Sequence, residues 1–104
     1  MTAGPERDGY QLRLVVAGST PRSRRAIENL RRICNEYLVG QVDCEIIDIY
    51  QQPGLAGTYQ VIAAPTLVRM LPLPVRRIVG DLSEGDRVLR SLEIFSPPVV
   101  GHVP

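Results

Sequence analysis

YQLRLVVAGSTPRSRRAIENLRRICNEYLVGQVDCEIIDIY, residues 10–50, carries the clearest fold signal of the chain, because its hydrophobic periodicity changes twice. Residues 10–17 alternate and then become apolar on both faces, which predicts a strand entering a covered sheet. Apolar residues then recur at helical spacing over residues 26–38, which predicts a helix lying on that sheet. β-Branched residues at 42–49 predict a second strand, parallel to the first and reached by a right-handed crossover.

The turn between the first strand and the helix carries a helix start signal. Gly18 suits the turn, Ser19 or Thr20 is the expected N-cap, and Pro21 suits the first helical position. We therefore expect the helix to begin at this turn.

Short elements complete the chain. Strands are expected at residues 66–70 and 75–79, and Pro72 and Pro74 between them interrupt the ladder and predict a hairpin-like return. Residues 51–60 predict a short helix or an irregular connector.

The last element is predicted to be a helix. Ser83 and Asp86 match a capping box, and apolar residues follow at helical spacing as far as Phe95. Within this helix, residues 92–94 also alternate as a strand does, so the local preference of the segment is divided.

The element order β-α-β, connector, β-β-α is typical of a thioredoxin-like α/β fold. We expect one such domain at residues 10–95, with a flexible arm at residues 1–9 and a flexible tail at residues 96–104. In this fold a cis proline commonly precedes the third strand beside a ligand groove. Pro65 occupies that place, and cis and trans forms are equally expected there.

The composition excludes several classes of function. A chain of 104 residues, 44% hydrophobic and 22% charged, fits one soluble domain, and its formal charge of +1 gives no general attraction to nucleic acid or membranes. The sequence has no signal-peptide pattern and no apolar run of about 20 residues, so we expect a cytoplasmic protein. No phosphate-binding glycine motif occurs, and no cofactor or metal site is predicted.

Catalytic chemistry lacks a suitable set of residues. A thioredoxin-type enzyme needs a reactive thiol at residues 18–21, and none is there, while Cys34 and Cys44 are interpreted as small buried hydrophobic residues. A hydroxyl at the helix start would still suit a bound glutathione, so a thioredoxin-fold oxidoreductase or glutathione-dependent enzyme is the alternative. Asp43 and Asp48 lie on opposite faces of a regular strand, which argues against a paired-acid site.

Arginine supplies all twelve basic residues of the chain, in two main groups. The group around the first helix consists of Arg22, Arg24, Arg25, Arg31 and Arg32. A solvated helix face explains this group. The second group, Arg69, Arg76 and Arg77, comes from the two late strands. Because Arg76 and Arg77 are adjacent, they point to opposite faces, and at least one is directed at a partner carboxylate or at a pair inside the fold.

The string LPLPVRRIVGDLS, residues 71–83, resembles the signature of the KaiB family. The strings LRLVVAGSTPRSRRAIENL (residues 12–30), IIDIYQQPGLA (46–56) and AAPTLVRMLP (63–72) follow the order and spacing of that family. The resemblance covers most of the expected domain.

This resemblance implies a non-enzymatic adaptor that binds a KaiC-type hexameric ATPase and modulates its phosphorylation and ATPase cycle in circadian or daily timing. It also implies a fold switch, in which a resting dimer or tetramer with a rearranged C-terminal half gives way to a thioredoxin-like monomer that binds. A KaiA-type protein or a clock histidine kinase is a further candidate partner. The alternative within the family is a stress-response interaction protein outside a true clock.

Carried over position by position, the resemblance implies partner contacts by Arg25, Arg69 and Arg76. The residues expected to shape the fold or its switch are Pro65, Pro72, Pro74, Gly80, Asp81 and Ser91. Clock members often carry glycine in place of Ser91, and serine, the better helix former, should favour the helical, binding-competent state. The acidic tail of the family is replaced by residues 96–104, which fits a non-clock branch.

Overall fold

The computed structural model describes residues 9–61 and 63–94. Its elements are β1 (Tyr10–Val16), α2 (Pro21–Tyr37), β2 (Val42–Asp48), α3 (Gly54–Thr58), β3 (Thr66–Leu71), β4 (Arg76–Val79) and α4 (Gly85–Leu92). The strands form one sheet in the order β2-β1-β3-β4. β1 pairs with β2 in parallel, and β1–β3 and β3–β4 are antiparallel. The predicted element order is confirmed. The expected tail, nearly all of the expected arm and Phe95 lie outside the described residues.

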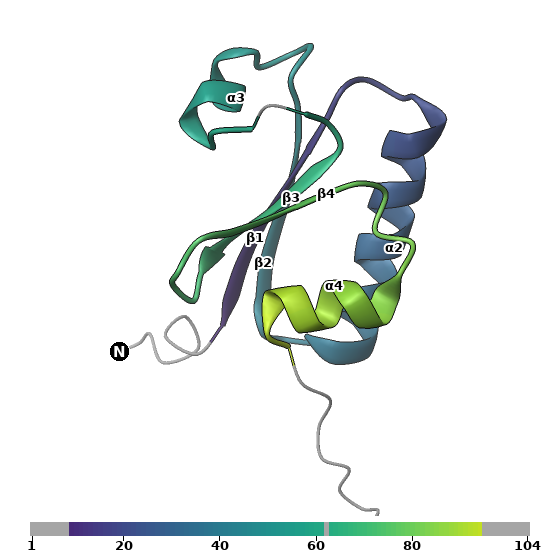
Figure 1. Ribbon diagram of the computed structural model, residues 1–104, viewed down its shortest axis with the longest axis vertical. Helices are drawn as coiled ribbons and strands as arrows, with labels where there is room; N and C mark the ends of the chain where they lie inside the picture. Colours follow the sequence, from purple (N-terminus) through teal and green to yellow (C-terminus); the bar gives the residue numbers. More distant parts are fainter. Residues whose placement is uncertain (1–8, 62, 95–104) are drawn as a thin grey trace, which may run out of the picture.

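The two longer helices lie together on one side of the sheet, and α3 lies toward the opposite end of the molecule from α4 (Figure 1). The core between the sheet and these helices is built from buried apolar side chains. It includes Leu12, Leu14 and Val16 of β1, Leu30 and Ile33 of α2, and Val88 and Leu92 of α4. Burial of each large side chain contributes roughly 1.5–3 kcal/mol, so the amphipathic faces of α2 and α4 hold both helices to the sheet.

The sheet is covered on its other face as well. Val15, Ile47 and Val68 are buried there although they do not belong to the core under α2 and α4. The doubly apolar end of β1 is therefore explained, as its pattern predicted, by a strand at the centre of a covered sheet.

The start of α2 follows the predicted signal. Thr20 is the N-cap, its hydroxyl accepts a hydrogen bond of 3.2 Å from the Ser23 backbone N–H, and Pro21 occupies the first turn. Since Thr20 performs the capping, the open choice between Ser19 and Thr20 is settled by the structure.

The predicted capping box of α4 is wrong. The N-cap is Glu84, and its side chain makes no capping hydrogen bond. The backbone N–H of Ser83 donates instead to the Asp81 carboxylate at 3.1 Å. Asp81 thus closes a local turn that delays the helix, because an aspartate readily bonds the backbone two residues ahead. None of the described helices is long and apolar enough to cross a membrane.

Candidate partner interface

Arg69 ties β3 to the end of α4. Its side chain is 0% exposed, and Nη1 donates to the Leu92 carbonyl and, at 3.4 Å, to the Glu93 carboxylate. Nη2 donates to the Pro74 carbonyl at 2.8 Å, whereas Nε finds no acceptor among the described residues. A guanidinium with several donors suits this position, because helix C-termini leave carbonyls without intrahelical partners. Arg69 presents no side-chain surface here, so contact with a partner would require α4 to move.

Arg76 lies on the same face of the sheet as Arg69. The two are register partners in β3 and β4, and Arg76 Nη2 pairs with the second Glu93 oxygen at 3.0 Å. Glu93 adopts a left-handed φ of 61° as the C-cap of α4. The Arg76 side chain is 44% exposed. Two arginines therefore share one carboxylate, and the outer arginine keeps donors free for a partner.

Arg77 points to the opposite face, as the strand pattern predicted. Its Nε donates to the Tyr59 carbonyl at 3.0 Å and its Nη2 to the Gln60 side chain at 3.1 Å. This arginine fastens the segment after α3 to β4.

A second arginine–carboxylate pair joins α2 to the loop before α4. Arg25 Nε lies 3.0 Å from Asp81 Oδ2, and the Arg25 side chain is 54% exposed. Asn29 donates to the Asp81 carbonyl at 2.8 Å. The Arg25 hydrogen bond, followed by hydrogen bonds from Ser83, holds the pKa of Asp81 below its ordinary value. The pair with Asp81 therefore orients Arg25 at the surface.

The residues assigned to the fold or its switch surround these pairs. The bonds before Pro65, Pro72 and Pro74 are all cis. Pro65 is buried, and its carbonyl accepts a hydrogen bond of 2.9 Å from Gly80. Gly80 has a φ of 125°, a conformation that side-chain-bearing residues rarely adopt. Ser91 lies half-buried in α4.

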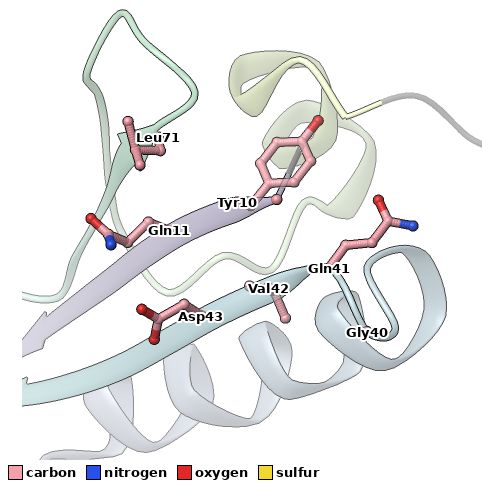
Figure 2. Close-up of a pocket in the computed structure, with 8 residues that line it drawn as sticks. Tyr10, Gln11, Gly40, Gln41, Val42, Asp43 and Leu71 are labelled. Carbon is pink, nitrogen blue, oxygen red and sulfur yellow. The ribbon is translucent and has the colours of Figure 1, made fainter. Parts of the chain in front are cut away.

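Cavities open among the described residues, and two of them differ in the chemistry of their lining. The larger, of about 380 Å³, runs between β4, the following loop and α4. Its lining includes Arg22, Arg77, Asp81, Arg87 and Ser91. The smaller, of about 190 Å³, lies where β1 and β2 begin, with Tyr10, Val42 and Leu71 around it (Figure 2). The larger groove combines arginine donors with the Asp81 loop, so it suits acidic groups better than the smaller cavity does.

The strand carboxylates divide as predicted. Asp43 and Glu45 both pair with Arg13, at 3.4 and 3.2 Å. Asp48 instead accepts hydrogen bonds from the backbone N–H groups of Gly18 and Tyr50. These contacts are structural, and no metal-binding group of three His, Cys, Asp or Glu side chains occurs in the described part of the chain.

The interpretation of both cysteines as buried is wrong. Cys34 is half-buried in α2, whereas Cys44 is exposed. The reason is the strand order, because β2 is an edge of the sheet and α2 leaves part of it uncovered. Sequence reasoning also missed Glu93, which has no motif around it and becomes important only where α4 meets β3 and β4.

Known structures resemble this fold. A thioredoxin of Fasciola hepatica superimposes with a TM-score of 0.69 at 18% identity, covering 86% of this chain and 85% of that one. The N-terminal domain of SasA from Synechococcus elongatus gives 0.67 at 20% identity, covering 89% and 91%. The predicted thioredoxin-like α/β fold is therefore confirmed.

Similarity to known sequences identifies the family, which the structural likeness alone does not. The circadian clock oscillator protein KaiB of Synechococcus sp. (strain RCC307) is 47% identical over 89 residues, which cover 86% of this chain and 81% of that protein. The protein of the same description from Prochlorococcus marinus (strain MIT 9312) is 46% identical over 89 residues, covering 86% and 85%. The KaiB domain model matches residues 13–94. From Arg13 to Ile94, nearly all of the described sheet and helices carry this likeness, and the chain belongs to the KaiB family.

Proposed function

We propose that this protein is a non-enzymatic timing regulator that docks on a KaiC-type hexameric ATPase and modulates its phosphorylation and ATPase cycle. The observation that carries the proposal is the KaiB domain match over residues 13–94. Relatives at 47% and 46% identity are described as circadian clock oscillator proteins, which favours a clock over a stress-response role. A KaiA-type protein or a clock histidine kinase is a further candidate partner.

The exposed arginines support a polar docking surface. Arg25 and Arg76 are each held by one carboxylate, Asp81 and Glu93, while about half of each side chain remains exposed. A guanidinium fixed in this way loses little further freedom when it binds a second carboxylate. We assign Arg25 and Arg76 direct contacts with acidic groups of the ring. We assign Arg69 a positioning role, because it is buried beneath Arg76 and holds Glu93.

The same contacts support a conformational gate. α4 meets the sheet through its apolar face and through Arg69 and Glu93, and its last residues are also compatible with a strand. We infer a resting dimer or tetramer with a rearranged C-terminal half, from which the thioredoxin-like monomer is released for binding in the cytoplasm.

Size-exclusion chromatography with light scattering tests docking. The full chain is examined alone and after hours with ATP and the KaiC-type ATPase from the same genome. We expect a slowly formed complex with the ring. Arg76→Glu should weaken it, because glutamate repels the acidic groups that arginine would bind. Arg32→Glu, an equal charge change at an exposed α2 position, is the matched control.

Two results would overturn parts of the proposal. Absence of a complex with an intact, nucleotide-loaded ring would remove this partner and direct the search to stress-response targets. Equal binding by the Arg76→Glu and Arg32→Glu variants would remove Arg76 from the interface.

A further inference from the structure

Both cysteines lie on the side of the sheet that α2 occupies, Cys34 in α2 and Cys44 in β2. Cys44 in β2 is the register partner of Leu12 in β1, and Leu12 packs in the core with Ile33 of α2. Since paired residues on neighbouring strands point to the same face, Cys44 points toward the side occupied by α2. Cys34 packs against the same core from the helix. The topology thus places two free cysteines from different elements on the same side of the sheet.

The two thiols are unequal. Interaction with the Cys44 thiol and burial raise the pKa of the Cys34 thiol. Interaction with Cys34 and the guanidinium charges of Arg13 and Arg31 lower the pKa of Cys44, although partial burial and the Asp43 carboxylate oppose this shift. Cys44 is also the exposed member of the pair. The accessible sulfur therefore belongs to the more acidic thiol, and a second thiol lies on the same side of the sheet, a combination found at oxidation-sensitive cysteines.

We propose that hydroperoxides oxidise Cys34 and Cys44, and that the two thiols then form a disulfide between α2 and the edge strand β2. This modification is independent of docking on a ring. The reaction is stoichiometric and not catalytic, because each chain reduces one peroxide molecule and reacts again only after a thiol reductant has reduced its disulfide.

The reaction balances with hydrogen peroxide as the oxidant. The Cys44 thiolate attacks one peroxide oxygen, the O–O bond breaks, and the departing hydroxide takes a proton from solvent to become water. Cys44 is left as a sulfenic acid. Cys34 sulfur then attacks Cys44 sulfur, an S–S bond replaces the S–O bond, and the hydroxyl leaves with the Cys34 proton as a second water. The two thiols lose two electrons, and the peroxide gains them.

Intact-mass analysis and non-reducing peptide mapping of the full chain test this site. Reduced protein is treated with hydrogen peroxide, and we expect the loss of two hydrogens per chain, one Cys34–Cys44 linked peptide, and full recovery with dithiothreitol. This measurement needs no variant, so it does not depend on how a substitution folds.

Paired variants test the order of events. In Cys34→Ser the sulfenic acid at Cys44 should persist and be trapped by dimedone. In Cys44→Ser, Cys34 should remain a thiol over the same exposure. Circular dichroism verifies that both variants are folded. Three outcomes would overturn the proposal: both thiols of the unmodified chain survive peroxide, disulfides form only between chains, or the two variants are trapped equally.

Discussion

Arg69 illustrates at the scale of one residue what the strand pattern could and could not predict. Alternation along β4 predicts that Arg76 and Arg77 point to opposite faces, as the structure confirms. The register between β3 and β4 then places Arg69 on the same face as Arg76. The same alternation does not say that α4 covers Arg69 while leaving Arg76 half exposed. The different environments of these two arginines follow from where a distant helix packs.

Replacing Arg69 should destabilise the protein far more than replacing Arg76. Arg69→Ala leaves two carbonyls without their donors in a buried site and opens a cavity, so we expect a loss of about 3 kcal/mol in the free energy of unfolding. Arg76→Ala removes an exposed pair with the same Glu93 and should lose less than about 1 kcal/mol. Urea unfolding at neutral pH measures both. Equal losses would contradict the positioning role of Arg69.

The Arg25–Asp81 pair predicts a pH dependence. Because folding lowers the pKa of Asp81, its contribution to stability is present above the ordinary value of 3.8 and is lost as pH falls from there through the folded pKa. An NMR titration of the Asp81 carboxyl in the unmodified chain and in Arg25→Gln tests whether Arg25 causes the lowered pKa. The variant should return the pKa toward its ordinary value, and an unchanged pKa would show that Arg25 is not responsible.

For the helices and strands, hydrophobic periodicity predicted that each element exists more reliably than it predicted where each element begins and ends. β1, α2 and β2 arise where their patterns are long and consistent. α4 starts at Gly85 without the predicted Ser83 cap, because Asp81 bonds the Ser83 backbone. Capping boxes depend on which nearby acceptor reaches a backbone N–H first, and a four-residue motif does not specify that competition.

Helix propensity at Ser91 should tune α4. Ser91→Gly is expected to weaken the helix by about 0.5 kcal/mol, and Ser91→Ala to strengthen it by a similar amount. If the C-terminal half rearranges as proposed, the glycine variant should increase the fraction of the resting oligomer and the alanine variant should reduce it. Light scattering and NMR peak volumes measure this balance. The helical population should decrease in the order alanine, serine, glycine at position 91. Any other order would argue that helix propensity does not control the balance.

Across the fold, the strand order supports the N-terminal and C-terminal halves of the chain to different degrees. β1 is flanked by strands on both sides, whereas β4 is an edge strand joined only to β3. α4 contributes Val88 and Leu92 to the shared core, but α2 contributes a longer apolar face. Fewer contacts therefore secure the β4–α4 segment than the β1–α2–β2 unit.

Native-state hydrogen exchange should reveal this inequality. Amides of β1 are expected to exchange only through global unfolding, and those of β4 and α4 through a smaller opening with lower free energy and weaker dependence on denaturant. Exchange followed by mass spectrometry across a series of low urea concentrations separates the smaller opening from global unfolding. Identical protection in both halves would contradict a C-terminal half that opens on its own.

Sequence patterns were sufficient to predict the α/β class, the element order, a helix start at residues 19–21 and the opposite directions of Arg76 and Arg77. These features follow from periodicity and from residues close along the chain. The enclosure of Arg69 and the pairing of Glu93 with two arginines instead depend on how α4 packs on the sheet. The tertiary structure also places Cys34 of α2 and the exposed Cys44 of β2 on the same side of the sheet. Those features depend on strand order and on how helices pack across the sheet, which local sequence patterns do not encode.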